Sequence, residues 1–152
     1  MRSLVLCIVF LSFTIISAQS EEKEIENTIA HFFEGFHKQD SLLIKQTILP
    51  TIVMQTIGKD SLGNAILKQE KFSSFLKSIV SIPKTLKFEE RIMAYHIQVD
   101  GEMANAWTPY EFWTNDTFSH CGVNSFQLFK DDGQWKIIYI IDTRRKGDCK
   151  KE

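Results

Sequence analysis

Polar side chains of types that suit acid–base chemistry gather in the last third of the sequence. They are two carboxylates, an imidazole, an amide and a guanidinium: Glu111, Asp142, His120, Asn124 and Arg144. The ordinary pKa of histidine lies close to physiological pH, so His120 is the predicted general acid or base, oriented by Asp142 or Glu111. The structural alternative is an ion pair between Asp142 and Arg144 or Arg145 that closes the rim of the fold.

An aromatic wall accompanies these polar groups, and the combination suits a small organic ligand. Trp107, Tyr110 and Phe112 supply the wall, although strand alternation leaves open which face Tyr110 and Phe112 occupy. The predicted ligand-binding residues are Trp107, Tyr110, Glu111, Asn124 and Arg144, and the predicted catalytic residues are His120 and Asp142.

Turn sequences indicate that long antiparallel strands position this site. Asp131-Asp132-Gly133 separates two apolar runs, and Asn115-Asp116 and Asp100-Gly101 do the same upstream. Asp-Gly between β-branched and aromatic runs is a strong hairpin signal. We therefore predict a meander of four long strands that starts with residues 92–99 and ends near Arg145.

Directly opposed residues on antiparallel strands point to the same face, so the turns also sort the side chains. A last turn centred on Asp132 and a tight turn at Asn115-Asp116 predict one face that carries the polar site. The predicted pairs on that face are Phe126 with Ile138, Asn124 with Ile140, Gly122 with Asp142, Glu111 with His120, Pro109 with Gly122 and Trp107 with Asn124.

The opposite face of the predicted sheet is also apolar, with Trp135, Ile137, Tyr139 and Ile141 assigned to it. A sheet that is covered by helices on one side only should alternate apolar and polar residues, so the second face needs a cover. We expect a homodimer; the alternative cover is a long loop or the C-terminal tail.

The first eighteen residues have the layout of a secretory signal peptide. Arg2 precedes an apolar run from Leu4 to Ile16, and small residues follow at Ser17-Ala18. The run is shorter than the roughly 20 apolar residues of a transmembrane helix. We expect cleavage near Ala18, a secreted or periplasmic location without membrane attachment, and one domain over residues 19–152.

Composition excludes several partners. The net charge is −1 and the basic residues form no stripe, which argues against nucleic acid and anionic membrane surfaces. The histidines lack the spacing of a zinc site, and we expect no metal and no cofactor. Cys121 and Cys149 are predicted to form a disulfide in an exported chain, with two free thiols as the alternative.

Ahead of the meander, the periodicity predicts helices. An acidic first turn at Glu21 opens an amphipathic helix, and further helices are expected over residues 41–46 and 71–80, with an extended run over 51–57 between them. Helices followed by a curved antiparallel meander that closes on them constitute an α+β arrangement.

This order of elements, with HCGVNSFQL, GQWKII and IDTRR in the meander, resembles the nuclear transport factor 2-like superfamily. The resemblance is greatest to its secreted bacterial SnoaL-like and lumazine-binding-like members. It implies a cone-shaped α+β fold with N-terminal helices packed in a strongly curved, mostly antiparallel sheet, and a dimer through the outer sheet face. It also implies a ligand cavity between the long strands and the first helix.

Relatives in that superfamily include ketosteroid isomerase, scytalone dehydratase, polyketide cyclases and purely binding modules, so the fold does not fix the function. The catalytic pattern of ketosteroid isomerase does not map onto this chain, and no catalytic residue is carried over. We expect an exported small-molecule-binding protein, with proton-transfer catalysis of the isomerase, lyase or cyclase type left open. The alternative is a non-catalytic extracytoplasmic interaction or dimerisation module.

Overall fold

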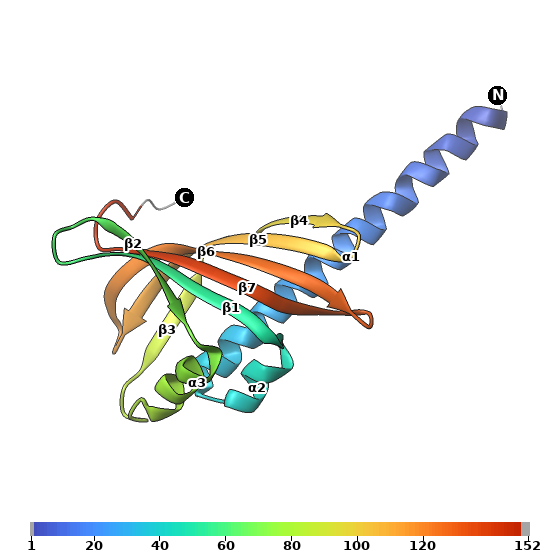
Figure 1. The fold of residues 1–152 in the computed structure, drawn as a ribbon. Helices are drawn as coiled ribbons and strands as arrows, with labels where there is room; N and C mark the ends of the chain where they lie inside the picture. The colour runs from blue at the N-terminus through green and yellow to red at the C-terminus, as the bar shows by residue number, and fades with distance from the viewer. Residues whose placement is uncertain (1, 150–152) are drawn as a thin grey trace.

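The structure is a computed structural model that describes the backbone of residues 2–149 and the side chains of residues 20–149. Its helices are α1 (Arg2–Lys38), α2 (Ser41–Gln46) and α3 (Phe72–Ser81). Its strands are β1 (Ile48–Lys59), β2 (Ala65–Glu70), β3 (Phe88–Ile92), β4 (His96–Asp100), β5 (Met103–Thr114), β6 (Thr117–Asp131) and β7 (Gln134–Arg145). In Figure 1 the curved sheet arches over α2, α3 and the C-terminal part of α1.

The strands form one sheet in the order β2-β1-β7-β6-β5-β3, with β4 also paired to β5. Every pairing is antiparallel except that of β1 with β7, which is parallel. This arrangement confirms the predicted α+β fold with helices packed in a curved, mostly antiparallel sheet.

The predicted strand over residues 92–99 is wrong in its extent, because two strands, β3 and β4, share its place along β5. Ile92 pairs with Tyr110 and His96 with Trp107, so residues 93–95 bulge away from the ladder. Pro109 lies opposite this break, where it accepts a hydrogen bond from Met93 N but has no N–H to donate in return.

Residues of α1 make the centre of the core. Ile25, Ile29, Phe32 and Phe33 are buried against the sheet, as their helical spacing predicts. The predicted helix start at Glu21 is wrong, because α1 begins at Arg2. No glycine or proline occurs between residues 2 and 34, so nothing in the sequence interrupts the helix there. The predicted signal peptide falls where side chains are not described, and it stays a prediction.

The predicted β5–β6 register is wrong by one residue. The turn at Asn115-Asp116 is tight, as expected, and Thr114 pairs with Thr117. An irregularity then follows Trp113 and leaves Ser119 unpaired in the register, so Phe112 pairs with His120. A slip of one residue moves every later side chain to the other face. The inward set on β5 is therefore Thr108, Tyr110 and Phe112, and Trp107, Pro109 and Glu111 lie on the outer face.

The β6–β7 register also differs from the prediction, for the same physical reason. A bulge between Gln127 and Leu128 leaves Ile138 without a partner in the ladder. Residues 135 and 137 therefore point inward on one side of the bulge, and residues 140 and 142 point inward on the other. The resulting pairs are Phe126 with Ile140, Asn124 with Asp142 and Gly122 with Arg144.

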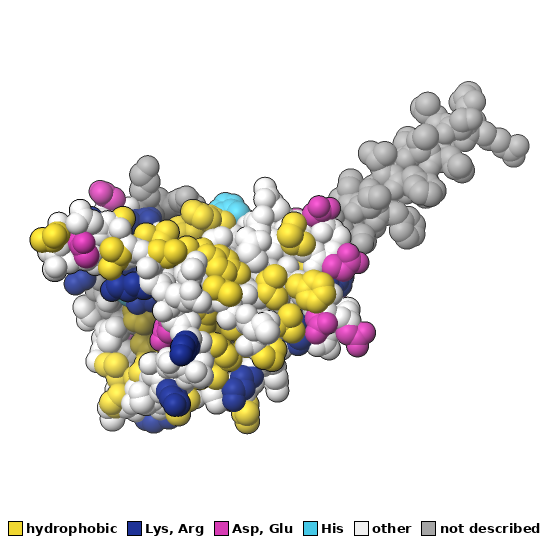
Figure 2. Space-filling view, in the orientation of Figure 1, with side chains coloured by type: hydrophobic (Ala, Val, Ile, Leu, Met, Phe, Trp, Pro, Cys, Tyr) yellow, Lys and Arg dark blue, Asp and Glu magenta, His cyan; other side chains and the backbone are white. Residues whose placement is uncertain are grey.

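The β6–β7 turn itself overturns half of the predicted dimer face, because it is centred between Asp132 and Gly133 and pairs Leu128 with Ile137. Trp135 is 4% exposed and Ile137 is 0% exposed, so both belong to the core. The outer face instead carries exposed Val53, Trp107 and Phe129. Figure 2 shows hydrophobic side chains spread over the sheet on the side in view. Among the residues described, no helix is both long and apolar enough to cross a membrane.

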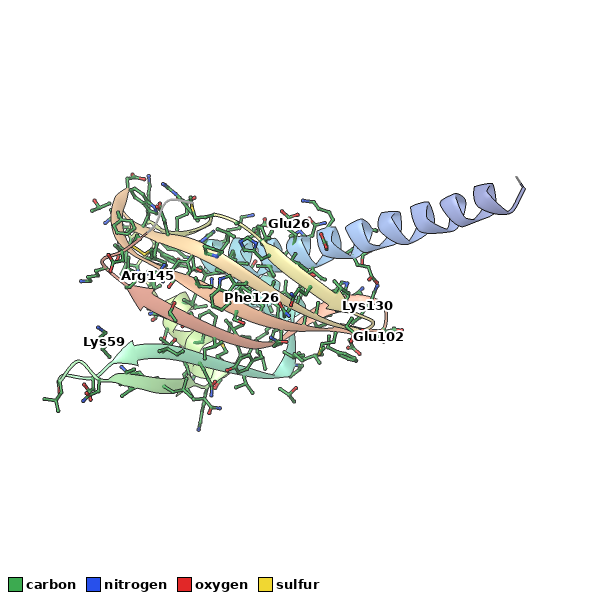
Figure 3. The ribbon with its side chains drawn as sticks, turned by 90° about the horizontal axis from the view of Figure 1, so that it is seen from above. Glu26, Lys59, Glu102, Phe126, Lys130 and Arg145 are labelled. Carbon is green, nitrogen blue, oxygen red and sulfur yellow. A yellow bond between two sulfur atoms is a disulfide. The ribbon has the colours of Figure 1, made fainter. Side chains whose placement is uncertain are left out.

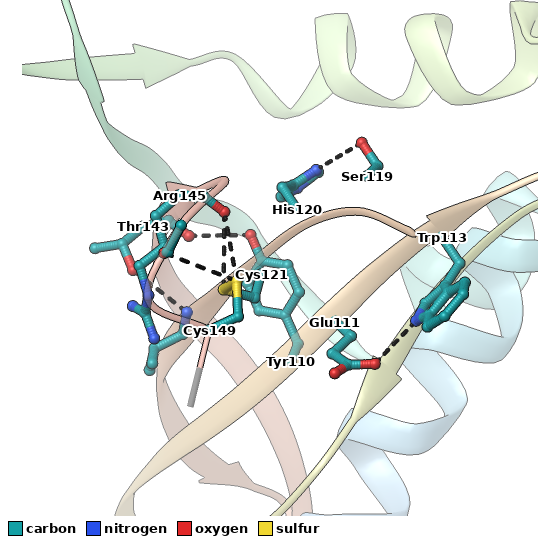
Figure 4. Close-up of a disulfide and its surroundings, with 11 residues drawn as sticks. Tyr110, Glu111, Trp113, Ser119, His120, Cys121, Thr143, Arg145 and Cys149 are labelled. Carbon is teal, nitrogen blue, oxygen red and sulfur yellow. Dashed lines mark hydrogen bonds between the residues drawn. A yellow bond between two sulfur atoms is a disulfide. The ribbon is translucent and has the colours of Figure 1, made fainter. Parts of the chain in front are cut away.

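The predicted disulfide between Cys121 and Cys149 is confirmed, with an S–S distance of 2.02 Å. The bond holds the C-terminal tail against β6, as Figure 4 shows. The disulfide lies near the end of the concave face where the polar residues Asn124, Asp142 and Arg144 gather.

Candidate functional site

The site begins with an alternating strand. In β3, Phe88, Glu90 and Ile92 are partly buried, whereas Glu89 and Arg91 are exposed. Alternation therefore sends one carboxylate, that of Glu90, into the concave side of the sheet. The prediction from sequence missed this residue, although the pattern Phe-Glu-Glu-Arg-Ile, with an acid at a position flanked by inward apolar residues, was the signal for it.

Two elements hold Glu90 in place. Asn124 Nδ2, from β6, donates a 2.7 Å hydrogen bond to Oε1 of Glu90. The backbone N–H of Glu90 donates to Nε2 of His37 at the end of α1, over 2.9 Å. An imidazole nitrogen that accepts a hydrogen bond is unprotonated, and burial lowers the pKa of His37 accordingly. The sequence analysis assigned no role to His37.

Asp142 lies beside this pair on β7, directly opposite Asn124. One carboxylate oxygen accepts a hydrogen bond from Thr56 Oγ1 and the other accepts a 2.7 Å bond from Arg144 Nε. Asp142 is 8% exposed, whereas the Arg144 side chain is 59% exposed. The guanidinium thus caps the buried carboxylate from the rim, and part of its attraction is screened by solvent.

The pKa of the Glu90 carboxyl is raised to about 7. Burial is the largest cause, because it disfavours the charged form, and the nearby Asp142 raises the pKa further. The hydrogen bond from Asn124 and the charge of Arg144 act in the opposite direction. Near pH 7 this carboxyl is therefore available both as a proton acceptor and as a proton donor.

Tyr110 stands next to this group and is locked to the backbone. Its hydroxyl donates a 3.0 Å hydrogen bond to the carbonyl oxygen of Thr143, and burial raises the pKa of the phenol. A Cβ at Gly122 would lie 1.9 Å from that same carbonyl and 2.7 Å from the Tyr110 ring. Gly122 is therefore required for the close approach of the tyrosine to β7.

A cavity of about 90 Å³ opens in front of these polar groups. One end of its wall is polar, and the rest is formed by phenylalanines of α1, α3 and β6. The lining includes Phe32, Phe33, Phe36, Phe75, Phe126, Thr56, Glu70, Glu90, Asn124, Asp142 and Arg144. Figure 3 shows Phe126 in the middle of the sheet, with Arg145 and Lys59 toward one end and Glu102 and Lys130 toward the other.

A second hollow of about 370 Å³ adjoins the first, since Phe36, Phe75, Glu70, Glu90 and Arg144 line both. Its other walls include Tyr110, Phe112 and His120. Glu90 therefore borders both spaces. Together the two hollows reach the size of ordinary small-molecule sites.

The structure brings three of the predicted site residues together: Asn124, Asp142 and Arg144 surround one end of the cavity. Tyr110 borders the adjoining hollow. Phe32 and Phe33 of α1 belong to the buried core and Phe36 packs against it, and all three also line the cavity.

His120 lies on the concave side, where the described residues give its imidazole no hydrogen bond to Asp142 or Glu111. Its ring stacks on Phe112 with centroids 4.9 Å apart, and its Nδ1 lies 3.1 Å from Ser119 Oγ. Burial and the charge of Arg144 lower its pKa. The predicted orientation of His120 by Asp142 or Glu111 is wrong, because no hydrogen bond joins the imidazole to either carboxylate among residues 20–149.

Two predicted ligand-binding residues lie outside the cavity. Trp107 is 52% exposed on the outer face. Glu111 accepts a 3.1 Å hydrogen bond from Trp113 Nε1, and Figure 4 shows that pair apart from His120. Both assignments failed because the bulge at Ser119 reverses the faces of β5. Within residues 20–149 there is also no group of three or more His, Cys, Asp or Glu side chains that could hold a metal ion.

The chain matches no protein-family model and no curated protein sequence. Solved structures do resemble it. An NTF2-like protein from Pseudomonas putida has a TM-score of 0.69 and 13% identity, over 88% of this chain and 93% of that one. An NTF2-like protein with a cystatin-like fold from Novosphingobium aromaticivorans has a TM-score of 0.66 and 12% identity, over 89% and 88% of the two chains.

A third similar structure is a candidate dehydratase of the NTF2-like family from Streptomyces avermitilis. Its TM-score is 0.63 and its identity 11%, over 84% of this chain and 98% of that one. At these identities the likeness is one of fold, and the chain accordingly has the cystatin-like architecture of NTF2-like proteins.

Proposed function

We propose that this protein binds a small organic molecule in the cavity beneath its curved sheet and transfers a proton to or from it through Glu90. The observation that carries the proposal is the Glu90 carboxyl, buried at the cavity wall with a pKa of about 7. General acid–base catalysis is most efficient when the pKa of the group lies near the working pH. Many isomerase, lyase and cyclase reactions include such a step.

The neighbours of Glu90 suit this role. Asn124 fixes Oε1 by a 2.7 Å hydrogen bond, whereas Oε2 accepts no hydrogen bond from the residues that the structure describes. The second oxygen is therefore available to a ligand. His37 holds the backbone of Glu90, so the carboxyl approaches the cavity from a fixed position.

The fold supports the same reading at a coarser level, since the similar structures include one named as a candidate dehydratase. That description belongs to the other protein. Here it serves as support for considering proton-transfer chemistry, and the assignment of Glu90 depends on the residues of this chain.

Deuterium exchange tests the proposal without knowledge of the reaction. A set of small molecules with acidic C–H groups is incubated with the protein in D₂O at pH 7, and loss of each C–H signal is followed by proton NMR. We expect exchange of at least one member, reduced roughly 100-fold or more in Glu90→Gln. Glu89→Gln is the matched control, because Glu89 is the adjacent carboxylate on the exposed side of β3. Unchanged exchange in Glu90→Gln would refute the catalytic role.

A second candidate function is a non-catalytic interaction module. The observation in its favour is the extent to which aromatic rings fill the cone: Phe32 and Phe33 both pack edge-on against Phe126, with centroids 6.4 and 6.1 Å away. The space left beside the polar end is only about 90 Å³. If the protein is such a module, none of the small molecules exchanges its C–H protons in D₂O. Native mass spectrometry of protein isolated from its source then shows no co-purifying small molecule.

We also propose that the protein acts outside the cytoplasm, as a homodimer. The disulfide between Cys121 and Cys149 and the predicted signal peptide both support an oxidising compartment. Exposed Trp107, Phe129 and Val53 on the outer sheet face support a second copy as the cover. Sedimentation of the mature chain tests the dimer, and detection of the mature N-terminus tests the cleavage.

A further inference from the structure

We propose that the ligand of this cavity is a cationic amine, with its ammonium group beside Glu90 and its carbon skeleton along the phenylalanines. The inference deepens the proposed function and rests on it, since it names the chemical class that the same cavity takes. It concerns binding, and it holds whether or not a proton is transferred afterwards.

The cavity wall carries more negative than positive side chains. The cavity lining contains three carboxylates, Glu70, Glu90 and Asp142, and one cation, Arg144. Arg144 Nε is already bonded to Asp142. Across residues 20–149, neither Glu70 nor Glu90 forms a salt bridge with Lys, Arg or His. A cavity with an excess of carboxylates favours a positive ligand, and a buried carboxylate without a countercharge gains most from one.

Apart from Arg144, the other titratable groups around Glu90 supply no positive charge. Three of them are uncharged near pH 7: His37 accepts a hydrogen bond from the Glu90 backbone, Tyr110 donates one to Thr143, and burial lowers the pKa of His120 in the adjoining hollow. None of these supplies a positive charge. Arg144 is therefore the one cation on the cavity wall among the residues described.

Lysines approach the site only from outside. Lys68 and Lys71 line a further hollow together with Glu70 and Arg144, and Glu90 does not border that space. They flank the outer end of the site and leave the buried carboxyl unpaired.

The aromatic wall of the cavity also favours a cation. Five phenylalanines line the cavity: Phe32, Phe33, Phe36, Phe75 and Phe126. The rings of Phe32 and Phe36 lie nearly parallel to that of Phe75, at 7° and 3°, with centroids 6.2 and 6.1 Å from it. Aromatic faces attract cations through the ring quadrupole, and aromatic cages recognise quaternary ammonium ligands.

Size is consistent with this class of ligand. About 90 Å³ suits a compact head group, and the adjoining hollow of about 370 Å³ has room for a carbon skeleton. An anionic head group fits the same space poorly. Among the described residues its one cationic partner on the wall would be Arg144, whose Nε already donates to Asp142, and it would lie beside Glu70, Glu90 and Asp142.

Three probes of similar shape and different charge test the effect of ligand charge on affinity. They are choline, its neutral carbon isostere 3,3-dimethylbutan-1-ol, and the anion 3,3-dimethylbutanoate. Each is titrated into the full-length mature protein at pH 8 by calorimetry. The Asn124 side-chain NH₂ signals report in parallel, by NMR, whether binding occurs at this site. We expect choline to bind at least tenfold more tightly than either of the other two.

The pH dependence gives a second readout. Choline carries a fixed charge, so any change in its affinity between pH 6 and pH 8 comes from the protein. Ionisation of Glu90, whose pKa is about 7, should tighten choline binding on the order of tenfold over this range. Glu90→Gln should bind more weakly at pH 8 and lose this dependence. Glu89→Gln should keep it, because Glu89 lies on the exposed side of β3, away from the cavity.

The outcomes are separable. Equal or tighter binding of the neutral isostere or of the anion, with shifts at Asn124, overturns the cationic class and leaves a small-molecule pocket in place. Absence of binding by all three also overturns the cationic inference, and the deuterium-exchange assay then decides the proposed function by itself. If choline binds without shifting the Asn124 side-chain NH₂ signals, the cation binds elsewhere on the protein. That result refutes the assignment of the cation to this cavity.

Discussion

Asn124 Nδ2 donates a 2.7 Å hydrogen bond to Oε1 of Glu90, and this contact joins β6 to β3 across the concave face of the sheet. The amide lowers the pKa of the carboxyl, whereas burial raises it. The balance between these two effects leaves the carboxyl able to gain or lose a proton near neutral pH.

Stability should fall as the pH rises from about 4.5 through 7. The pKa of Glu90 is near 7 in the folded chain, against its ordinary value of 4.5. Between these values the folded chain holds a proton that the unfolded chain has lost, so raising the pH favours unfolding. The contribution of Glu90 reaches up to about 3 kcal/mol. Urea unfolding of wild type and Glu90→Gln measures it: the variant should lack this slope, whereas Glu89→Gln should retain it.

Asn124→Leu should raise the pKa of Glu90 above 7, because the hydrogen bond that favours the ionised form is removed. A shift of roughly one unit or more corresponds to the usual strength of a hydrogen bond to a charged group. Carboxyl carbon chemical shifts of Glu90, followed against pH, measure it. His120→Ala should move this pKa far less, and a larger shift in His120→Ala than in Asn124→Leu would reverse the assignment.

Replacing Cys121 and Cys149 by Ser should lower the free energy of unfolding by about 3 to 4 kcal/mol. The two cysteines are 28 positions apart, and the chain-entropy model gives this magnitude for such a loop. Chemical unfolding of the double variant and of the wild type compares the two. Two reactive thiols per unfolded, unreduced wild-type chain would contradict the bridge.

Gly122→Ala should destabilise the fold strongly, by about 3 kcal/mol or more. The added Cβ would lie 1.9 Å from the backbone oxygen of Thr143, which cannot move without breaking the β6–β7 ladder. Gly147→Ala is the control, since nothing lies within 4 Å of a Cβ built there. Thermal unfolding of the two variants decides the point, and equal melting temperatures would show that the strands can separate locally.

Trp107→Lys should convert the proposed dimer to a folded monomer. Trp107 is 52% exposed on the outer face, so the introduced lysine side chain would lie in solvent in the monomer. In the dimer it would lie against an apolar partner surface, which disfavours association. Analytical ultracentrifugation and circular dichroism measure the two effects separately. Ile137→Lys is the contrasting variant: Ile137 is 0% exposed, so this change should unfold the chain. A wild-type protein that sediments as a monomer at micromolar concentration would refute the dimer.

The sequence by itself determined most of the elements and their order, but not the start of α1 or the division of the first meander strand into β3 and β4. Asn115-Asp116 and Asp132-Gly133 hold positive φ angles in tight turns, and residues of these types adopt such angles most easily. The helical spacing of Ile25, Ile29 and Phe32 set the buried face of α1. These features depend on neighbours along the chain. Local periodicity and turn chemistry therefore sufficed for them. The pairing of Cys121 with Cys149 was predicted on another ground, the export context.

Tertiary structure alone decided which side chains share the cavity. The bulges at Ser119 and Ile138 each add one residue to a strand, and a single residue reverses every face beyond it. For this reason Glu111 and Trp107 left the predicted site. Glu90 entered the site because β3 pairs with β5 at the edge of the sheet and directs Glu90 to the concave side, a placement that depends on long-range pairing. Its raised pKa follows from burial among Phe36, Phe75 and Asp142, which only the assembled fold brings around it.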